Sequence, residues 1–381
     1  MAEPPITRRA GSTRPTGHRS RRRGRVAACL TALAAAPVMG LILGLILGLP
    51  ASGALAGEPV RLTVVGGLAG VSQYRQLEQP FWQTEIGERT GGRLTVSIRP
   101  FNESGLRGED MLQLMRLGVV PFGTALLAVA AGDEPELNAV DLPALNPDMT
   151  ALRQNVGHYR EHLRAVLRER YGIELLGIYA YPAQVLFCTR KFEGLADLAG
   201  RRIRTSSVGQ SELMAALGAM PVIIPFAETV AALRDGVADC AITGTLSGYE
   251  IGLSGVATHV HAMAISWGMS FFGANIAAWR ALPADLRDEV RRGVADLEQR
   301  IWKQAEDDTA RGLACATQTA CPGAPRKAMT LVPLSPRDAE RRQRLLTETV
   351  LPRWIERCGE ACVGIWNETL KPALGVTAKA E

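Results

Sequence analysis

The sequence predicts an α/β protein with largely parallel sheets, and two observations carry this prediction. The stretch Asp197–Gly244 alternates strand and helix signals in a β-α-β-α-β order, which is the order that builds a parallel sheet. The chain has 381 residues, and about 325 of them follow an N-terminal targeting segment. That length is enough for two domains with cores of their own.

Residues 1–56 have the features of a secretory signal. A cluster of arginines precedes the apolar run Val26–Leu49, and small residues follow it at Ala54-Leu55-Ala56. The arginines are Arg19, Arg21, Arg22, Arg23 and Arg25. We expect cleavage before Gly57 and export of the mature chain. An uncleaved anchor is the alternative, because the apolar run is long enough to span a bilayer.

The positive charge of the chain belongs to this segment. The whole sequence has 43 basic and 38 acidic residues, and residues 1–56 hold eight Arg and one Glu, so 35 basic and 37 acidic side chains remain. The mature chain is therefore close to neutral, with slightly more acidic than basic groups. A nucleic-acid partner is not expected, because the basic surface that such a partner needs is missing.

The remaining elements follow from apolar runs, periodicity and breakers. Expected strands are Val60–Val65, Ile173–Ala180, Gln184–Thr189, Arg202–Arg204, Val222–Pro225, Val237–Thr243 and Met329–Val332. Ser270–Ala277 is a further apolar run. Expected helices are Gln73–Thr90, Met149–Tyr171, Gln210–Leu217, Phe226 to Gly236, Pro283–Cys315 and Pro336–Glu356. The helix from Pro283 is amphipathic, with one apolar face traced by Leu286, Val290, Val294, Leu297, Ile301 and Ala305.

Arg204 ends a short strand directly before the helix cap Thr205-Ser206-Ser207. A guanidinium fork beside the free N–H groups of a helix N-terminus suits a carboxylate or a phosphate. The alternative is an ordinary surface arginine, like its neighbours Arg201 and Arg202. The sequence thus offers Arg204 as a candidate anion ligand.

The stretch GRRIRTSS…LGAMPVIIPFAETVAALRDGVADCAITG resembles the signature of the extracytoplasmic solute-binding proteins of TRAP transporters, of the dicarboxylate-binding-protein type. Arg89–Pro100 and Gly105–Gly118 resemble further segments of that family. The resemblance implies a two-lobed periplasmic-binding-protein fold, in which each lobe is a mostly parallel sheet flanked by helices. It also implies that the helix from Pro283 spans both lobes.

The same resemblance implies how the lobes divide. Lobe 1 is expected over residues 57–182 with a return segment at about 270–305, and lobe 2 over 183–269 with about 306–370. The tail covers 371–381, and we expect Gly375–Glu381 to be disordered.

The resemblance also implies roles for individual residues. In the family, the arginine at the position of Arg204 holds the substrate carboxylate. Gln184 stands where many relatives carry a second arginine, and a neutral side chain argues against a ligand with two strongly anchored anionic groups. Cys240 stands where the family usually has Gly, and Ala241–Gly244 replaces a more polar run.

We expect further contacts around this arginine. Glu228 is expected to orient the guanidinium and Phe226 to pack beside the ligand. Ser207 and Thr243 are expected to add weaker polar contacts. Gly67, in the glycine turn after the first strand, is expected at the cleft edge, and Trp267 either stacks on the ligand or fills a hinge.

Six cysteines lie in the mature chain. An exported chain with an even number of cysteines favours disulfides. The candidates are Cys315, Cys321, Cys358 and Cys362. Their spacing leaves local and crosswise pairing open, and a zinc site is a less favoured alternative. Cys188 and Cys240 fall in apolar strands and are expected to be small buried side chains without a partner.

Metal and catalytic sites find little support. The pairs His158/His162 and His259/His261 lack a third ligand at suitable spacing, so no metal is expected. No Gly-x-Ser-x-Gly elbow, paired acid–base carboxylates or phosphate loop occurs, so neither an enzyme nor a cofactor is expected.

The sequence therefore predicts a monomeric periplasmic protein that closes around a small organic acid and delivers it to a TRAP membrane permease. Phe226, Trp267 and Thr243 indicate a partly apolar or aromatic body behind the carboxylate. A binding subunit of a sensor or of another transporter class is the first alternative. An exported hydrolase is the second.

Overall fold

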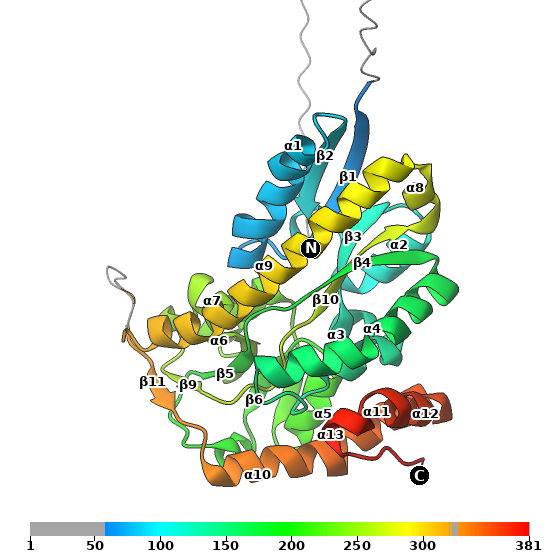
Figure 1. Cartoon of the computed structure of the whole chain (residues 1–381). Helices are drawn as coiled ribbons and strands as arrows, with labels where there is room; N and C mark the ends of the chain where they lie inside the picture. Colours follow the sequence, from blue (N-terminus) through cyan, green and yellow to red (C-terminus); the bar gives the residue numbers. More distant parts are fainter. Residues whose placement is uncertain (1–57, 320, 322–326, 381) are drawn as a thin grey trace, which may run out of the picture. The chain divides into compact units, whose positions relative to one another are not determined.

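Two β-sheets, each in its own lobe, organise the chain in a computed structural model that describes residues 58–319, 321 and 327–380 (Figure 1). The strands of the first sheet are β1 (Val60–Gly66), β2 (Leu94–Pro100), β3 (Phe122–Leu126), β4 (Ile173–Tyr179) and β10 (Ser270–Asn275). Those of the second are β5 (Gln184–Cys188), β6 (Arg202–Thr205), β7 (Met220–Ile223), β8 (Cys240–Gly244), β9 (His259–His261) and β11 (Thr330–Val332). Their spatial orders are β2-β1-β3-β10-β4 and β11-β9-β5-β8-β6-β7.

The prediction of a two-lobed α/β fold with mostly parallel sheets is confirmed, and each sheet contains one strand that runs antiparallel to its neighbours. In the first sheet β10 runs antiparallel to β3 and β4, and in the second β5 runs antiparallel to β8 and β9. Both strands are those by which the chain enters one lobe from the other. Gln184 pairs with Gly244 and Ser270 with Leu126, so each entering strand starts at the carboxyl edge of its parallel neighbours and runs back.

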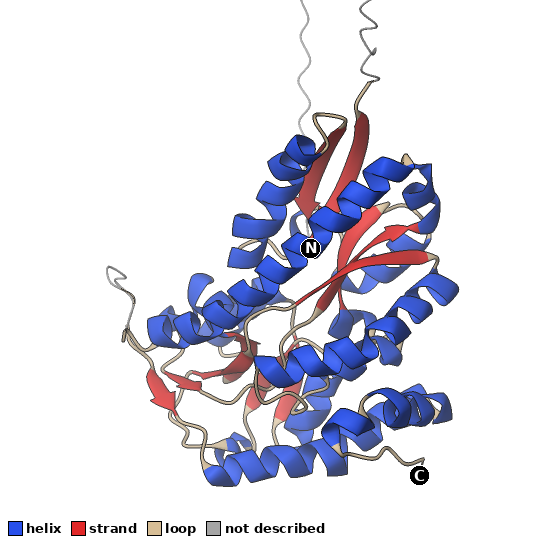
Figure 2. Ribbon diagram, in the orientation of Figure 1, coloured by secondary structure: helices blue, strands red, loops and turns tan. Residues whose placement is uncertain are grey.

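The helices flank both sheets (Figure 2). Those between the strands are α1 (Ile86–Arg89), α2 (Met111–Arg116), α3 (Leu127–Ala130), α4 (Met149–Tyr171), α5 (Val208–Ala216), α6 (Thr229–Arg234), α7 (Thr245–Glu250), α8 (Ile276–Ala281) and α9 (Ala284–Ala316). Those of the C-terminal part are α10 (Pro336–Leu345), α11 (Leu351–Cys358), α12 (Glu360–Thr369) and α13 (Lys371–Leu374). The predicted helix Met149–Tyr171 has these bounds because Asp148 caps its start and left-handed Gly172 ends it.

The helix predicted over Gln73–Thr90 is present but irregular. The segment is helical without a gap from Ser72 to Arg89 and contains two π turns, Tyr74–Glu78 and Phe81–Glu85, before the short α1. Pro80 interrupts the regular hydrogen-bond ladder between them, since it has no N–H to donate.

The long helix α9 spans both lobes, as predicted. Its 33 residues extend about 50 Å, and its apolar face is buried. Trp302 donates its indole N–H to the carbonyl of Ile178 in the first sheet, at 2.7 Å. Near its C-terminal end, Gly312 lies against the backbone of Leu246 in α7 so closely that any Cβ would clash. Figure 1 shows α9 running from the first sheet to α7.

Two hydrophobic clusters form the core. One fills the space between the first sheet and α9, around Phe81, Trp82 and Val290. The larger one covers the other face of that sheet and continues through the second sheet to α11 and α12. Burial of these apolar side chains stabilises the two lobes together.

Three disulfides are present in the described residues. Cys315 pairs with Cys321 and Cys358 with Cys362, which decides the open question in favour of local pairing. The third joins Cys188 and Cys240, so the prediction that these two cysteines are unpaired is wrong. They stand directly opposite each other in the β5–β8 pair, a register that the sequence alone does not reveal.

The predicted disorder of the tail is also wrong for residues 375–380. Trp366 donates its indole N–H to the carbonyl of Val376, and the side-chain amide of Asn367 both donates to and accepts from the backbone of Ala378. Ala378 is buried. Side-chain partners in α12 thus fix a segment that has no regular structure.

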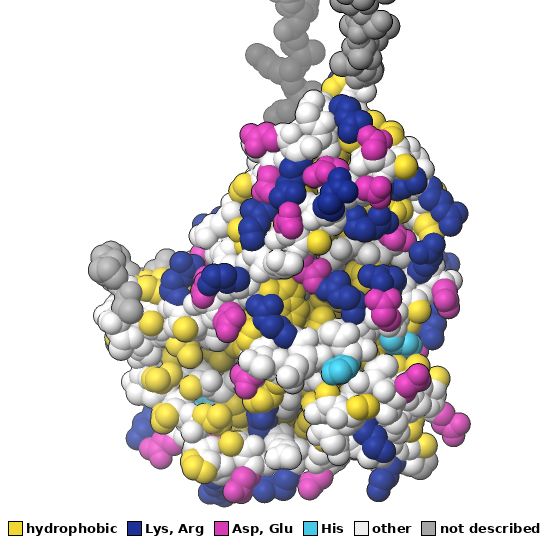
Figure 3. Space-filling model, viewed as in Figure 1, with side chains coloured by type: hydrophobic (Ala, Val, Ile, Leu, Met, Phe, Trp, Pro, Cys, Tyr) yellow, Lys and Arg dark blue, Asp and Glu magenta, His cyan; other side chains and the backbone are white. Residues whose placement is uncertain are grey.

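The predicted signal segment, residues 1–56 with cleavage before Gly57, lies outside the described residues. Across residues 58–319, 321 and 327–380, no helix combines the length and the apolarity needed to cross a membrane. On the face shown in Figure 3, basic and acidic side chains are interspersed rather than separated by sign.

Candidate ligand-binding site

A cavity of about 350 Å³ lies where the chain crosses between the two sheets. The crossing segments contribute Tyr181, Gly268 and Met269 to its wall. The polar side chains that line it from the second lobe are Gln184, Arg204, Ser206, Glu228, Thr243 and Ser247. Its size and its mixture of apolar walls with few polar groups are typical of a small-molecule site.

Arg204 is the central polar group of this cavity. It lies on β6 and is 2 % exposed. Its Nε donates to the carbonyl of Ile224 at 2.8 Å, and its Nη1 donates to the carbonyl of Ile242 at 2.7 Å. No carboxylate in the described part of the chain pairs with it, and Nη2 has no acceptor there. The cation therefore keeps donors free for a ligand.

Burial lowers the pKa of Arg204 to about 10, because a desolvated cation is less stable than a hydrated one. At neutral pH the guanidinium still carries its charge. A buried cation without a counterion is costly, and an anionic ligand in the cavity supplies the missing partner.

The predicted role of Glu228 as the orienting residue is wrong. Glu228 is exposed at the start of α6 and makes no hydrogen bond or ion pair with Arg204 among the described contacts. Main-chain carbonyls take this place because β6 lies between β7 and β8, and the carbonyls come from Ile242 within β8 and from Ile224 directly after β7. Glu228 and Phe226 do line the cavity, and Phe226 is half-buried.

Strand pairing brings three predicted ligand residues to one edge of the second sheet. β8 lies between β6 and β5, with Ala241 beside Arg204 and Gly244 beside Gln184. Thr243 therefore lies between Arg204 and Gln184, and its hydroxyl has no partner in the described residues. The three side chains offer hydrogen-bond donors from neighbouring strands.

Three predicted site residues do not line the cavity. Ser207 caps α5 by accepting from the N–H of Gln210, and its neighbour Ser206 lines the cavity in its place. Trp267 is buried behind the wall, where its indole N–H donates to the carbonyl of Asn146. The N–H of Gly67 donates to Glu78, at 2.9 Å, on the side of lobe 1.

Sequence reasoning missed the wall that lobe 1 provides. It is mainly apolar and consists of Leu68, Val71, Phe101, Leu106, Leu126 and Val129. Leu68, Phe101 and Leu126 lie at or just beyond the carboxyl ends of β1, β2 and β3, where α/β proteins bind ligands. Their position at the carboxyl ends of strands was the feature of the sequence that could have identified these residues.

Two fully buried carboxyl groups lie beside the cavity without lining it. Burial raises the pKa of Glu78 and of Asp141 to about 7. The hydrogen bonds that each carboxylate accepts act in the opposite direction and lower the pKa, but burial has the larger effect. Asp141 accepts from the main-chain N–H groups of Trp267, Gly268 and Met269. It thereby fixes the crossing segment that forms one wall of the cavity.

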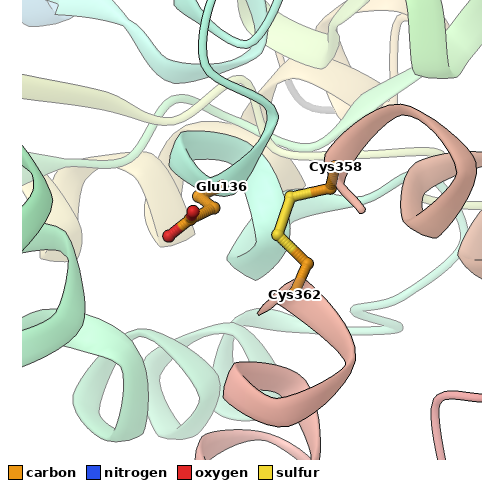
Figure 4. A group of neighbouring side chains, drawn as sticks. All are labelled: Glu136, Cys358 and Cys362. Carbon is orange, nitrogen blue, oxygen red and sulfur yellow. A yellow bond between two sulfur atoms is a disulfide. The ribbon is translucent and has the colours of Figure 1, made fainter. Parts of the chain in front are cut away.

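One group of side chains in the described residues is close enough to hold a metal ion: Glu136, Cys358 and Cys362 (Figure 4). The two sulfur atoms are bonded to each other, so neither is a thiolate ligand. The carboxylate of Glu136 is held by His162 and Arg170. Glu136 thus pairs with two side chains of α4, and the disulfide joins α11 to α12, so all three residues have partners within the protein.

Comparisons with known proteins place these features in context. The sequence model of the family described as "Bacterial extracellular solute-binding protein, family 7" (DctP) matches residues 70–341. The C4-dicarboxylate-binding periplasmic protein DctP of Rhodobacter capsulatus is 26% identical over 219 residues, which cover 56% of this chain and 64% of that protein.

Two solved structures are similar in fold. DctP7 of Bordetella pertussis, an extracytoplasmic solute receptor binding pyroglutamic acid, has a TM-score of 0.73 at 22% identity, covering 81% of this chain and 99% of that one. A TRAP periplasmic solute-binding protein of Rhodoferax ferrireducens with bound malonate has a TM-score of 0.70 at 22% identity, covering 81% and 97%.

Proposed function

The chain belongs to the bacterial extracellular solute-binding protein family 7, and we propose that it binds a small organic acid outside the cytoplasm and delivers it to a TRAP-type membrane permease. Residues 1–56 act in this proposal as the export signal. The acid lies between the two lobes and is anchored by its carboxylate on Arg204.

The single observation that carries the proposal is the environment of Arg204. The guanidinium is buried at a cavity, is oriented by two carbonyls, and has no counterion in the described residues. A carboxylate fits this donor set because it accepts two parallel N–H bonds and neutralises the charge. The relatives that bind pyroglutamic acid and malonate are bound to carboxylates as well.

The charges of the cavity favour a ligand with a single strong anionic group. Arg204 is its buried cation, while Arg107 at the wall is exposed and paired with Asp110. Glu109 and Glu228 line the same cavity and disfavour a second negative charge. Together with the apolar wall of lobe 1, this supports a monocarboxylate with an apolar body.

Calorimetry on a panel of mono-, di- and oxo-acids tests the proposal. We expect binding of at least one monocarboxylate, and a loss of roughly 30-fold or more in affinity for Arg204→Ala, since truncation of one partner of a buried charge pair costs ~2–5 kcal/mol. Arg201→Ala is the matched control, because Arg201 bonds to carbonyls of Arg190 and Lys191 away from the cavity. A folded Arg204→Ala protein with wild-type affinity contradicts the site assignment.

A further inference from the structure

A closed set of hydrogen bonds surrounds the side-chain amide of Gln184. This residue opens β5 and lines the cavity. Its Oε1 accepts from Nε2 of Gln210 at 2.5 Å and from the hydroxyl of Ser266 at 2.8 Å. Nε2 of Gln210 also donates to Ser266, at 2.9 Å. The oxygen of Gln184 is therefore already engaged by two protein donors.

A main-chain group fixes the direction of these bonds. The N–H of Ser206 points at Oε1 of Gln210, at 2.9 Å, and the hydroxyl of Ser206 approaches the same atom at 3.1 Å. A main-chain N–H can only donate, so the atom that it meets must be the amide oxygen of Gln210. The NH₂ group of Gln210 then faces Gln184, and Gln184 must turn its own oxygen toward it. Reversal of either amide would set two donors face to face.

The NH₂ group of Gln184 is consequently left for the cavity. It lies beside Gly268, where an added Cβ would stand 2.6 Å from Nε2, so glycine provides the space that this group occupies. Gly268 also lines the cavity and has a positive φ of 67°, a second reason for glycine there. No protein acceptor meets this nitrogen within the described residues. Gln184 can donate to a ligand, but it has no free lone pair to offer.

Gln210 controls this arrangement without belonging to the cavity wall. It is 2 % exposed, lies in the first turn of α5, and uses both ends of its amide on Ser206, Ser266 and Gln184. It is a positioning residue, and its effect on a ligand passes through the orientation of Gln184.

We propose that Gln210 locks Gln184 as an obligate donor, so that the site selects acids whose second polar group is an uncharged hydrogen-bond acceptor, such as a keto or amide carbonyl. The proposal rests on the proposed function, because Arg204 must hold the carboxylate of the same ligand. An acid without the acceptor leaves the NH₂ group of Gln184 unpaired when water is expelled. A second carboxylate receives hydrogen bonds from Gln184 but no balancing charge.

Calorimetry with acids of one chain length tests this. The probes are pentanoate, 2-oxopentanoate, 4-oxopentanoate and pentanedioate. For the wild-type protein, we expect the better of the two oxo acids to bind about tenfold more tightly than pentanoate, and pentanedioate to bind no more tightly than pentanoate. In Gln210→Met, which releases the amide of Gln184 without adding charge, the preference for the oxo acid should fall to less than about threefold. Its affinity for pentanoate should stay near that of the wild type.

Gln210→Glu provides a second, nearly isosteric variant. Its carboxylate still accepts from Ser206 but can no longer donate, so Gln184 must reverse its amide and present oxygen to the ligand. The preference for the oxo acid over pentanoate should then vanish, and this ratio is insensitive to the added charge, which weakens both acids. Gln304→Met, at a partly exposed glutamine of α9 bonded to Gln76, is the matched control and should keep the wild-type ratio.

The possible outcomes separate the two proposals. If pentanoate binds through Arg204 but the wild-type protein shows no preference for either oxo acid, the role of Gln210 is overturned while the proposed function stands. The role of Gln210 is likewise overturned if the preference survives in folded Gln210→Met or Gln210→Glu. If none of the acids binds, both proposals fail.

Discussion

The guanidinium of Arg204 is hydrogen-bonded to the main-chain carbonyl of Ile242, the residue before Thr243 on the neighbouring strand, at 2.7 Å. A second carbonyl, from Ile224, holds Nε. The sheet thus orients the cation with uncharged acceptors, which fix its direction without neutralising it. A carboxylate in this place would compete with the ligand for the same charge.

This arrangement predicts that Glu228 is dispensable. We expect Glu228→Gln to bind the best acid of the panel within about threefold of the wild type, because Glu228 is exposed and does not touch Arg204. Arg204→Lys should lose at least about tenfold, since an ammonium group cannot bond both carbonyls and still present a fork. Calorimetry measures both variants. A large loss in Glu228→Gln would instead favour direct ligand contact by that carboxylate.

A second prediction concerns the disulfide between β5 and β8. Cys188 and Cys240 are 52 residues apart, and a loop of that length is worth up to ~4 kcal/mol in the chain-entropy account of disulfides. We expect the double variant Cys188→Ala/Cys240→Ala to lower the free energy of unfolding by about 2–4 kcal/mol in urea titrations.

The disulfide between Cys358 and Cys362 closes a much shorter loop, with a separation of 4 residues, so the double variant Cys358→Ala/Cys362→Ala should cost less. Peptide mapping under non-reducing conditions provides an independent check. Alkylation of both Cys188 and Cys240 in the untreated protein would show that they are not bonded.

The third prediction is a pH dependence that arises from Glu78. Its carboxyl group is fully buried and accepts from the N–H of Gly67 and the hydroxyl of Thr124. Burial raises its pKa from 4.5 to about 7, so between these values the folded state binds a proton that the unfolded state has released. Its contribution to stability is full below pH 4.5 and is lost as the pH rises toward 7, by up to ~3 kcal/mol.

Glu78→Gln should remove this loss. The glutamine oxygen can accept from Gly67 while its NH₂ group donates to Thr124. We therefore expect the stability of the variant, relative to the wild type, to increase between about pH 5 and pH 8 in urea titrations. Glu340→Gln, at an exposed position of α10, is the control. Parallel curves for Glu78→Gln and the wild type would mean that Glu78 titrates normally.

In lobe 2 several of the residues named from the sequence line the cavity, because they lie within one continuous stretch. Arg204 and Thr243 lie at or near strand ends and Phe226 and Glu228 at a helix start inside that stretch, and the resemblance added Gln184. Contacts between distant segments were not predictable in the same way. The disulfide partner of Cys188 depends on the register of β5 against β8, which no local pattern encodes.

The roles of polar side chains were harder still to foresee. Glu228 occupies a helix start at the same cavity as Arg204, yet the carbonyls of Ile224 and Ile242 hold the guanidinium. Gln210 looks like an ordinary residue of a helical turn, and its function emerges only when Ser206, Ser266 and Gln184 are brought together. Such networks are determined by tertiary packing, which sequence periodicity does not describe.

The last prediction concerns a contact between the lobes. Glu250, at the end of α7 in lobe 2, accepts from the N–H of Ser72 at 3.1 Å and pairs with Arg75 at 2.7 Å, and both of these residues follow β1 in lobe 1. None of the three lines the cavity. A ligand bound between two hinged lobes holds them together, and this contact should add to that closed arrangement.

We expect Glu250→Ala to weaken binding of the best acid by about two- to thirtyfold, mainly through faster dissociation. The partly exposed ion pair with Arg75 is worth at most ~1 kcal/mol, and the hydrogen bond to Ser72 contributes a similar amount. The effect should shrink at high salt as the charges are screened. Stopped-flow dissociation rates measure it. Glu356→Ala, which breaks a surface pair with Arg353 inside α11, is the control and should leave the rate unchanged.

Solution scattering should show that the wild-type protein becomes more compact with ligand, and that Glu250→Ala does so less completely. Unchanged dissociation and identical scattering in a folded Glu250→Ala protein would show that this contact does not couple the lobes, since the ligand would then close them without its help.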